Sequence, residues 1–441
     1  MRRENFKLCV LSALVGVCFA ASAGMDRSRF NIGTYYLAKA HRSEQMVRDM
    51  KACGIDFVIQ DFTNDPQAQK WLAKNKMGSV ELYVVPVFWG GKTNVNGNIS
   101  KLCPVAKYVE ELKKHSFTRT EWMYNLGDEL SALDFPHLGA AIRAMRKIRP
   151  KVPIYLNLHP SWHRDDDIRT YYGTKDYRAY IEAYCREIPL DYISYDHYPY
   201  AYPNIRDWCF ARYFDNFRIV ADACKATGRS FWFIPQVNTY DTSVDMTEDK
   251  LRYQAFAALS FGAEVLTWAC WSPGWWEKNV LYKDGTKTDQ YERLKTVNAE
   301  IRRIAGPYMQ FRRVETHFTG FTGPAEEWLK PEPRTFLPQL NFNETNGVST
   351  VAFADVKADD GKALIVGDFV ERKAGGKKCA MLVFAADDPF GENPSERVVR
   401  FTSRREVKAI VSRGEAKLEQ TGDGAYAVRL RSSDCVFVVA R

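Results

Sequence analysis

Short apolar runs alternate with amphipathic runs through the first two thirds of the chain. The apolar runs are rich in β-branched and aromatic residues, which is typical of strands buried on both faces. They occupy residues 30–37, 56–62, 80–89, 121–126, 154–158, 192–198, 231–237 and 264–271. In the intervening segments apolar residues recur at spacings of three and four, as in Met46, Val47 and Met50, and this period predicts helices. Alternation of strands and helices in turn predicts a parallel sheet.

Eight strand–helix pairs fit between residues 24 and 308, the number and length expected of a closed (β/α)8 barrel, or TIM barrel. The main rival is an open doubly wound sheet, which usually carries a glycine-rich phosphate loop after its first strand. Here those residues read Tyr35-Tyr36-Leu37-Ala38-Lys39, with no glycine among them. We therefore expect an α/β fold built on a closed barrel.

The pattern changes near Gly306-Pro307, and a second domain is expected over residues 309–441. Short, often alternating runs follow one another there, separated by turn residues, which is typical of an antiparallel β-sandwich. They cover residues 348–353, 363–369, 379–384, 397–401, 407–411, 425–430 and 435–439. Residues 320–346 are rich in Pro, Gly and Asn and are expected to form an irregular connection. This domain could bind carbohydrate, but bracing the barrel is the role we expect.

The first 23 residues have the pattern of a secretory signal peptide. Arg2, Arg3 and Lys7 precede an apolar run over residues 8–21, and Ala21-Ser22-Ala23 is a small-residue cleavage site. The run is too short for a comfortable membrane span, and no second apolar stretch is long enough to be one. We expect a secreted or periplasmic protein without a transmembrane segment.

Charge and cysteine patterns argue against several classes of partner. The formal net charge of +8 comes from scattered basic residues, and no nucleic-acid-binding motif is present. The eight cysteines beyond residue 23 lie far apart with no C-x-x-C pair, which argues against a zinc site. Asp165-Asp166-Asp167, near His163, lacks the glycine and distal glutamate of a calcium loop. We predict no nucleic-acid partner, no catalytic metal and no other cofactor, and the oligomeric state is left open.

Two adjacent carboxylates, Asp128 and Glu129, lie between the fourth predicted strand and the helix that follows it. In a parallel barrel all strands end on one side, and the chemistry of such enzymes is found there. A carboxyl at that rim can protonate a leaving group or stabilise a developing cation. The alternative is a solvated acid pair beside a helix start, where the helix dipole favours negative charge.

The other predicted strands also end in polar and aromatic residues. Together with the acids, the predicted mouth comprises Tyr35, Tyr36, Gln60, Asp61, Phe62, Phe88, Trp89, Asn125, Asn157, His159, Asp196, His197, Tyr198, Tyr200, Gln236, Asn238, Trp268, Trp271, Trp275 and Trp276. Amides and carboxylates suit a hydroxyl-rich ligand, aromatic faces suit sugar rings, and no serine or cysteine nucleophile arrangement is present. We therefore predict a sugar site.

Several of these residues also have structural alternatives. Asp196 could accept a hydrogen bond from a neighbouring ring, and His197 could be a satisfied rim histidine. Trp275 and Trp276 could pack the eighth loop.

At this point the barrel resembles the clan A type of (β/α)8 glycoside hydrolases, loosely like family 42 β-galactosidases. The matching pieces are the acid-bearing fourth strand, the sixth-strand run Asp196-His197-Tyr198-Pro199 and the eighth-strand run from Trp268 to Pro273. The segment from Leu281 to Asn298 and the C-terminal sandwich also look like such proteins. The resemblance implies hydrolysis of a glycosidic bond in an oligo- or polysaccharide, with Glu129 as the general acid/base.

One position departs from that pattern. Clan A enzymes carry the nucleophilic glutamate at the end of strand seven, where this chain has Gln236, and an amide cannot form a glycosyl ester. Three explanations stay open. Asp128 and Glu129, similar to the acid pair of family 20 and 123 hexosaminidases, could act on a 2-acetamido sugar whose own acetamide attacks. Asp196 could be the partner carboxylate, as base or nucleophile. The protein could also have lost catalysis and only bind glycans.

The working hypothesis is a secreted glycoside hydrolase with Glu129, Asp128 and Asp196 as catalytic residues. The expected substrate-binding residues are Tyr35, Asp61, Trp89, Asn157, His197, Tyr198, Gln236, Trp268 and Trp271. The alternative from another functional class is a non-catalytic glycan-binding protein.

Overall fold

The computed structural model describes residues 24–62, 64–82, 88–89, 103–161, 172–201, 206–274, 276–320, 348–373, 375–415 and 417–441, with only the backbone at 82, 88–89 and 206–211. The predicted leader over residues 1–23, Trp275, the run 165–167 with His163, and nearly all of the connection over 320–346 lie outside these residues.

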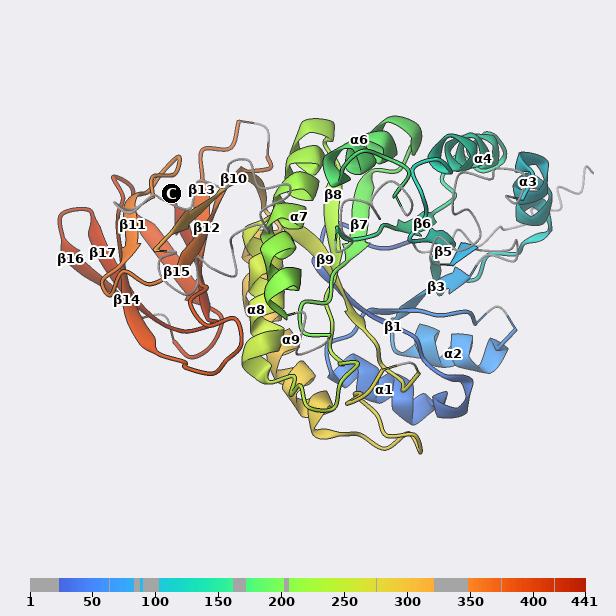
Figure 1. Ribbon diagram of the computed structural model, residues 1–441, viewed down its shortest axis with the longest axis horizontal. Coiled ribbons are helices and arrows are strands. Elements are labelled where there is room, and N and C mark those ends of the chain that lie inside the picture. Colours follow the sequence, from blue (N-terminus) through green and yellow to red (C-terminus); the bar gives the residue numbers. More distant parts are fainter. Residues whose placement is uncertain are drawn as a thin grey trace, which may run out of the picture.

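Eight parallel strands form a ring, so the predicted (β/α)8 barrel is confirmed (Figure 1). The strands are β1 (Asn31–Tyr35), β2 (Phe57–Ile59), β3 (Gly78–Leu82), β5 (Glu121–Asp128), β6 (Ile154–Asn157), β7 (Tyr192–Asp196), β8 (Ser230–Ile234) and β9 (Ala263–Ala269). β1 pairs with both β2 and β9, and a single bridge between Leu158 and Tyr195 joins β6 to β7.

The third predicted strand, 80–89, corresponds to two elements in the structure. β3 covers its first part, and the two-residue β4 (Phe88–Trp89) pairs with Gly127 and Asp128 at the end of β5. The second strand stops at Ile59, earlier than residue 62, and the Phe62 amide donates to the Glu81 side-chain carboxylate of β3 instead of to a backbone carbonyl.

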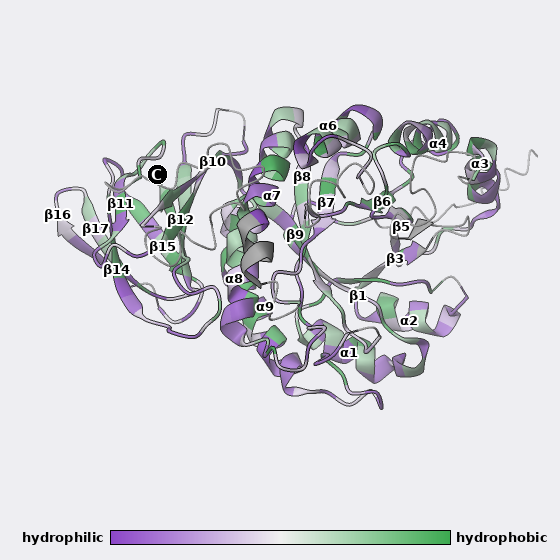
Figure 2. Ribbon diagram, viewed as in Figure 1, coloured by the Kyte–Doolittle hydropathy of each residue, from purple (hydrophilic) through white to green (hydrophobic). Residues whose placement is uncertain are grey.

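Helices surround the ring as the apolar spacing predicts. They are α1 (Glu44–Ala52), α2 (Pro66–Lys74), α3 (Val105–Lys114), α4 (Phe135–Ile148), α6 (Tyr177–Glu187), α7 (Arg206–Thr227), α8 (Glu248–Ser260) and α9 (Asp289–Tyr308), with a short 3-10 turn η1 (Lys39–His41). Ser43, Asp65 and Asp176 each accept a hydrogen bond from a backbone amide three residues on, which caps the helix start. Figure 2 shows hydrophilic and hydrophobic residues on different sides of outer helices such as α1 and α3.

Large rings packed over glycines fill the lower barrel interior. Gly33 lies two residues before Tyr35 on β1 and so faces the same side of the strand. The Phe57 ring covers Gly33, the Trp122 ring covers Gly78, and the centroids of the two rings are 6.1 Å apart. A side chain at either glycine would displace one of these rings.

The C-terminal domain is the predicted antiparallel sandwich of two sheets. One contains β10 (Phe311–Thr319), β12 (Leu364–Glu371), β13 (Cys379–Ala385), β18 (Cys435–Ala440) and β15 (Val407–Val411). The other contains β11 (Ala354–Ala358), β14 (Glu396–Thr402), β17 (Ala425–Arg431) and β16 (Leu418–Gly422). The apolar core between them includes Val366, Val383, Val399, Val428 and Val438.

The strand boundaries of the sandwich differ from the prediction in two ways. The predicted strand over 348–353 is wrong, because Val348 forms only an isolated bridge with Val356. β10, β11 and β16 were not predicted, since their sequences interleave charged and polar residues with few apolar ones.

Helix α8 lies between the barrel and the sandwich (Figure 1). Its residues from Leu251 to Ser260 are all buried, because the barrel covers one side and β12 and β13 cover the other. β12 approaches so closely that a Cβ on Gly367 would press on the Ser260 carbonyl. No helix of the described residues is both long and apolar enough to cross a membrane.

Candidate active site at the barrel mouth

Three strand ends bring two aspartates to one asparagine. Asp128 ends β5, Asn157 ends β6 and Asp196 ends β7. The Asn157 side-chain amide donates to Asp196 Oδ1 at 2.7 Å and to Asp128 Oδ1 at 3.1 Å. Both carboxylates are therefore held at the same point of the mouth, as the sequence-based clustering of Asp128, Asn157 and Asp196 requires.

A second layer of side chains orients that amide. Ser194 Oγ donates to Asn157 Oδ1 at 2.9 Å, and the Tyr155 hydroxyl lies 3.1 Å from Ser194 Oγ. Because its oxygen is occupied by Ser194, the amide must present its two N–H groups to the acids. Neither Ser194 nor Tyr155 is among the residues predicted from the sequence. The signal was available, since Tyr192, Ser194 and Asp196 alternate on one face of a buried strand.

Glu129 follows directly, in a backbone conformation that is uncommon for a side chain of its size. Its φ is +51°, in the left-handed region, and its amide donates to the Asn157 carbonyl at 3.0 Å. The turn places Glu129 Oε1 3.6 Å from His159 Nδ1, with 24% of the glutamate side chain exposed. Unfavourable backbone geometry of this kind is concentrated at functional sites.

Burial raises the pKa of all three acids, and the charge of a neighbouring acid adds to the rise at Glu129 and Asp196. The pKa of Glu129 is raised well above its usual value by burial and by the charges of Asp196 and Asp128. Burial and the Asp128 charge raise the pKa of Asp196 to about 7, although Asn157 and Tyr198 oppose that rise. Burial raises the pKa of Asp128 to about 6, and the Asn157 hydrogen bond and the nearby Tyr35 hydroxyl oppose that rise.

No lysine or arginine of the described residues forms an ion pair with Asp128, Glu129 or Asp196. No cation among these residues offsets the effect of burial, so all three acids keep a proton more readily than a free carboxyl does. Among the same residues, no group of three or more His, Cys, Asp or Glu side chains is arranged to hold a metal ion.

An aromatic wall, made of Tyr198, Tyr240 and Trp276, stands beside the acids. Tyr240 stacks on Trp276 with centroids 4.1 Å apart, and Tyr198 meets the indole edge-on at 5.0 Å. Tyr35, Tyr198 and Tyr240 pack against a small apolar cluster that contains Ile234 and Trp276 and is separate from the main core. Trp276 was expected at the mouth with loop packing as its alternative, whereas Tyr240 was missed.

The end of β8 carries no carboxylate. Ile234 lies in the apolar cluster of the mouth. Gln236 is fully buried; its Oε1 accepts from the Tyr200 amide at 2.7 Å, and its Nε2 donates to the Asn238 carbonyl at 2.8 Å. Its side chain is thus bound to the protein backbone at both ends and is not presented to a ligand.

Three further residues predicted to bind substrate are directed away from the mouth. His197 Nδ1 lies 2.9 Å from Asn216 Nδ2 of α7, and the imidazole packs edge-on against the Tyr213 ring. Trp268 is fully buried and donates to Asn298 of α9 at 2.9 Å. Trp271 is also fully buried, with its indole N–H 3.2 Å from Met46 Sδ of α1. The prediction that these three residues face the mouth is wrong, because their rings fill the layer between strands and helices.

The remaining predicted residues differ in how close they come to the acids. Tyr35 and Tyr198 lie beside Asp128 and Asp196, whose pKa values they lower. Asp61 is half-buried, and its charge raises the pKa of Glu81 and of Glu121, not that of an acid at the mouth. The Trp89 backbone pairs with Asp128, and its side chain lies outside the described residues.

Searches by sequence find no match, either among protein-family profiles or among curated proteins. Several solved structures are similar in fold. A protein described as a glycoside hydrolase matches with a TM-score of 0.50 and 10% identity over 95% of this chain and 97% of its own. A glucosidase from Croceicoccus marinus (TM-score 0.42, 10% identity) and endo-glycoceramidase II from Rhodococcus sp. (0.42, 12%) each match over 95% of this chain and 98% of theirs. At these identities the likeness is one of fold.

Proposed function

We propose that this protein is a glycoside hydrolase that acts on an oligo- or polysaccharide, with Glu129 as general acid/base. The observation that supports it is the convergence of three carboxyls at the barrel mouth, two of them held by the Asn157 amide. Glycosidic bond cleavage needs one carboxyl that is protonated and one that is ionised. The strongly raised pKa of Glu129 favours its protonated form, whereas the hydrogen bonds from Asn157 favour the ionised form of the aspartates.

The partner of Glu129 is the Asp128–Asp196 pair, because β8 offers no acid. If Asp196 attacks or activates water, it must be ionised, and hydrogen bonds from Asn157 and Tyr198 favour that form. If the substrate's acetamide attacks, Asp128 is the residue that orients it, with Tyr35 and Asn157 as its partners. The two routes differ in substrate, since only the second requires a 2-acetamido sugar.

Glu129→Gln tests the assignment. The amide keeps the size of the side chain but cannot donate a proton to a leaving group, so kcat/KM should fall by about 10²–10⁴-fold. The measurement is release of reducing sugar from a panel of polysaccharides and aryl glycosides, with the melting temperature as a check on folding. Turnover by Glu129→Gln at the wild-type rate would disprove the proposal.

Glu81→Gln is the matched control. Glu81 is a second barrel glutamate whose pKa is raised; it is fully buried, and burial raises its pKa to about 8. Its charged neighbours are Glu121 and Asp61 and not the aspartates of the mouth. Activity of this variant should stay within about threefold of wild type, although its stability can change.

A non-catalytic glycan-binding protein is the second candidate, and the end of β8 favours it. Ile234 and Gln236 occupy the strand end where the clan A pattern has its nucleophile, and both polar atoms of the Gln236 amide are hydrogen-bonded within the protein. This function predicts saturable binding of a glycan and no released sugar from any member of the panel.

A further inference from the structure

We propose that the β-sandwich is part of the catalytic apparatus, because one of its loops positions Tyr198 and the aromatic wall through Tyr200 and Gln236. Tyr200 and Gln236 are positioning residues in this proposal, since neither faces the mouth. The inference rests on the proposed hydrolase function. It gives Gln236, the amide at the end of β8, a positioning role.

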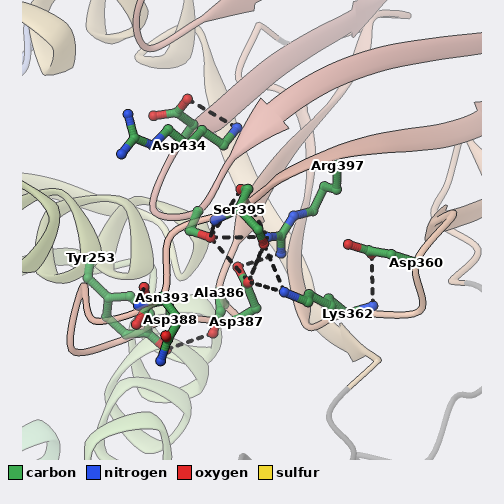
Figure 3. Close-up of polar contacts among 12 residues, drawn as sticks. Tyr253, Asp360, Lys362, Ala386, Asp387, Asp388, Asn393, Ser395, Arg397 and Asp434 are labelled. Atoms are coloured by element: carbon green, nitrogen blue, oxygen red, sulfur yellow. Dashed lines mark hydrogen bonds and ion pairs between the residues drawn. The ribbon is translucent and has the colours of Figure 1, made fainter.

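The sandwich loop of residues 386–393 is itself held firmly. Its base is anchored by Asp387, whose Oδ2 accepts from Arg397 at 2.6 Å and which forms an ion pair with that buried guanidinium (Figure 3). Its tip is closed by Asp388, whose carboxylate accepts from the Glu392 amide at 3.1 Å and the Asn393 amide at 2.8 Å. The loop therefore presents its carbonyl groups in a fixed place.

Two barrel tyrosines donate their hydroxyls to this loop. Tyr200, in the turn of residues 198–201 after β7, donates to the Pro389 carbonyl and meets the Phe390 ring edge-on at 6.2 Å. Tyr253, on α8, donates to the Ala386 carbonyl at 3.2 Å. Of the two, only Tyr200 is connected to the mouth, because its turn begins at Tyr198.

The Tyr200 backbone connects this contact to the aromatic wall. Its amide donates to Gln236, whose Nε2 donates to the Asn238 carbonyl. The Asn238 side chain donates to Asn279 Oδ1 at 2.7 Å, and Asn279 donates to the Trp276 carbonyl at 2.9 Å. A continuous chain of hydrogen bonds thus runs from the turn to Trp276.

The turn is also tied directly to both tyrosines of the wall. The Ala201 amide donates to the Tyr198 carbonyl at 3.3 Å, and the Ala201 carbonyl accepts from the Tyr240 amide at 3.1 Å. Displacing the turn would therefore move Tyr198 and Tyr240 together. Since Tyr198 lowers the pKa of Asp196, the displacement should also alter how that acid titrates.

Tyr200→Phe and Tyr253→Phe form a matched pair for the test. Each removes one hydroxyl that donates to the same loop, so both should lower the melting temperature by a similar few degrees. Tyr200→Phe should also lower kcat/KM by about 5–20-fold and raise the apparent pKa of the acid limb of the pH profile. Tyr253→Phe should leave kcat/KM within twofold of the wild-type value and the apparent pKa of the acid limb unchanged. Phe390→Leu, made on the sandwich side alone, should reproduce the direction of the Tyr200→Phe effects.

Equal kinetic and pH effects in the two tyrosine variants would overturn the inference, because the contact would then be structural only. Calorimetric titration with the glycan that wild type binds best separates this outcome from failure of the proposed function. If wild type binds glycan without cleaving it, the hydrolase proposal fails. The positioning proposal then stands if Tyr200→Phe weakens binding and Tyr253→Phe does not, and it falls if both bind as wild type does.

Discussion

Asn157 joins two acids because a primary amide offers two N–H donors from one nitrogen. Each N–H takes one carboxylate oxygen, at 2.7 Å and 3.1 Å, while Ser194 occupies the amide oxygen. Replacing Asn157 with Asp would bring a third negative charge to the pair, where burial already opposes ionisation. At this site the choice of an amide is therefore as specific as the choice of the acids around it.

The raised pKa of Asp196 predicts a pH-dependent gain in stability for Asp196→Asn. With a folded pKa of about 7 and an ordinary unfolded value near 4, the folded protein binds more protons between those pH values, so its stability falls as pH rises. The amide removes that cost and keeps an oxygen for Asn157.

We expect the melting temperature of Asp196→Asn to exceed that of wild type by about 1–3 °C at pH 8 and to match it near pH 4. Scanning calorimetry at the two pH values measures the difference in melting temperature. The same variant should have lost its activity. A variant less stable than wild type at pH 8 would contradict the direction of the shift.

Among the elements, β3 is shaped by its neighbour's ring. Gly78 leaves the space that the Trp122 ring occupies, and Gly33 does the same for Phe57. This pairing of glycine and aromatic residue allows the narrow barrel interior to be filled without overlap.

Gly78→Ala should destabilise the protein by about 2 kcal/mol or more, because the new methyl would overlap Trp122. Gly306→Ala is the control, since a Cβ at that position in α9 would meet no atom within 4 Å. It should be neutral or stabilise by up to about 1 kcal/mol, because alanine favours the helix. Urea unfolding curves give the free energy of unfolding of both variants. Equal changes in the two would show that the Trp122 ring can shift away from the new methyl without loss of stability.

Across the whole molecule, the sandwich completes the burial of barrel helices. Tyr253 of α8 meets Phe384 at 5.0 Å, and Tyr308 of α9 meets Phe369 at 5.4 Å and Phe437 at 5.9 Å. Arg252 and Glu300 link the two helices by a buried ion pair at 2.8 Å. One surface of each helix would face water without the second domain.

A chain ending at Tyr308 should therefore expose an apolar surface and fail to fold as a monomer. The expected result is aggregation, or binding of a hydrophobic dye in the soluble fraction, because large exposed apolar patches drive association. Light scattering measures the aggregation and dye fluorescence measures the exposed apolar surface. Both are recorded for residues 24–308 and, for comparison, for residues 24–441. A monodisperse truncated barrel that melts with the longer chain would show that the sandwich is dispensable for folding.

The sequence by itself determined the number and order of the barrel elements and the acids at its rim. Hydrophobic periodicity reports which segments bury a face, and in a parallel barrel every strand end must share one side. Asp128, Glu129, Asn157 and Asp196 follow from that rule. Periodicity could not find β10, β11 or β16, whose charged residues conceal the alternation.

Only the tertiary structure decided which of two adjacent side chains at a strand end faces the mouth. Side chains alternate along a strand, so an uncertainty of one residue reverses the assignment. That reversal explains why Trp268 and His197 pack against helices while Ala269 and Asp196 lie toward the mouth. The role of Gln236 likewise depends on Tyr200 and Asn238, which its buried amide reaches only because the chain folds them around it.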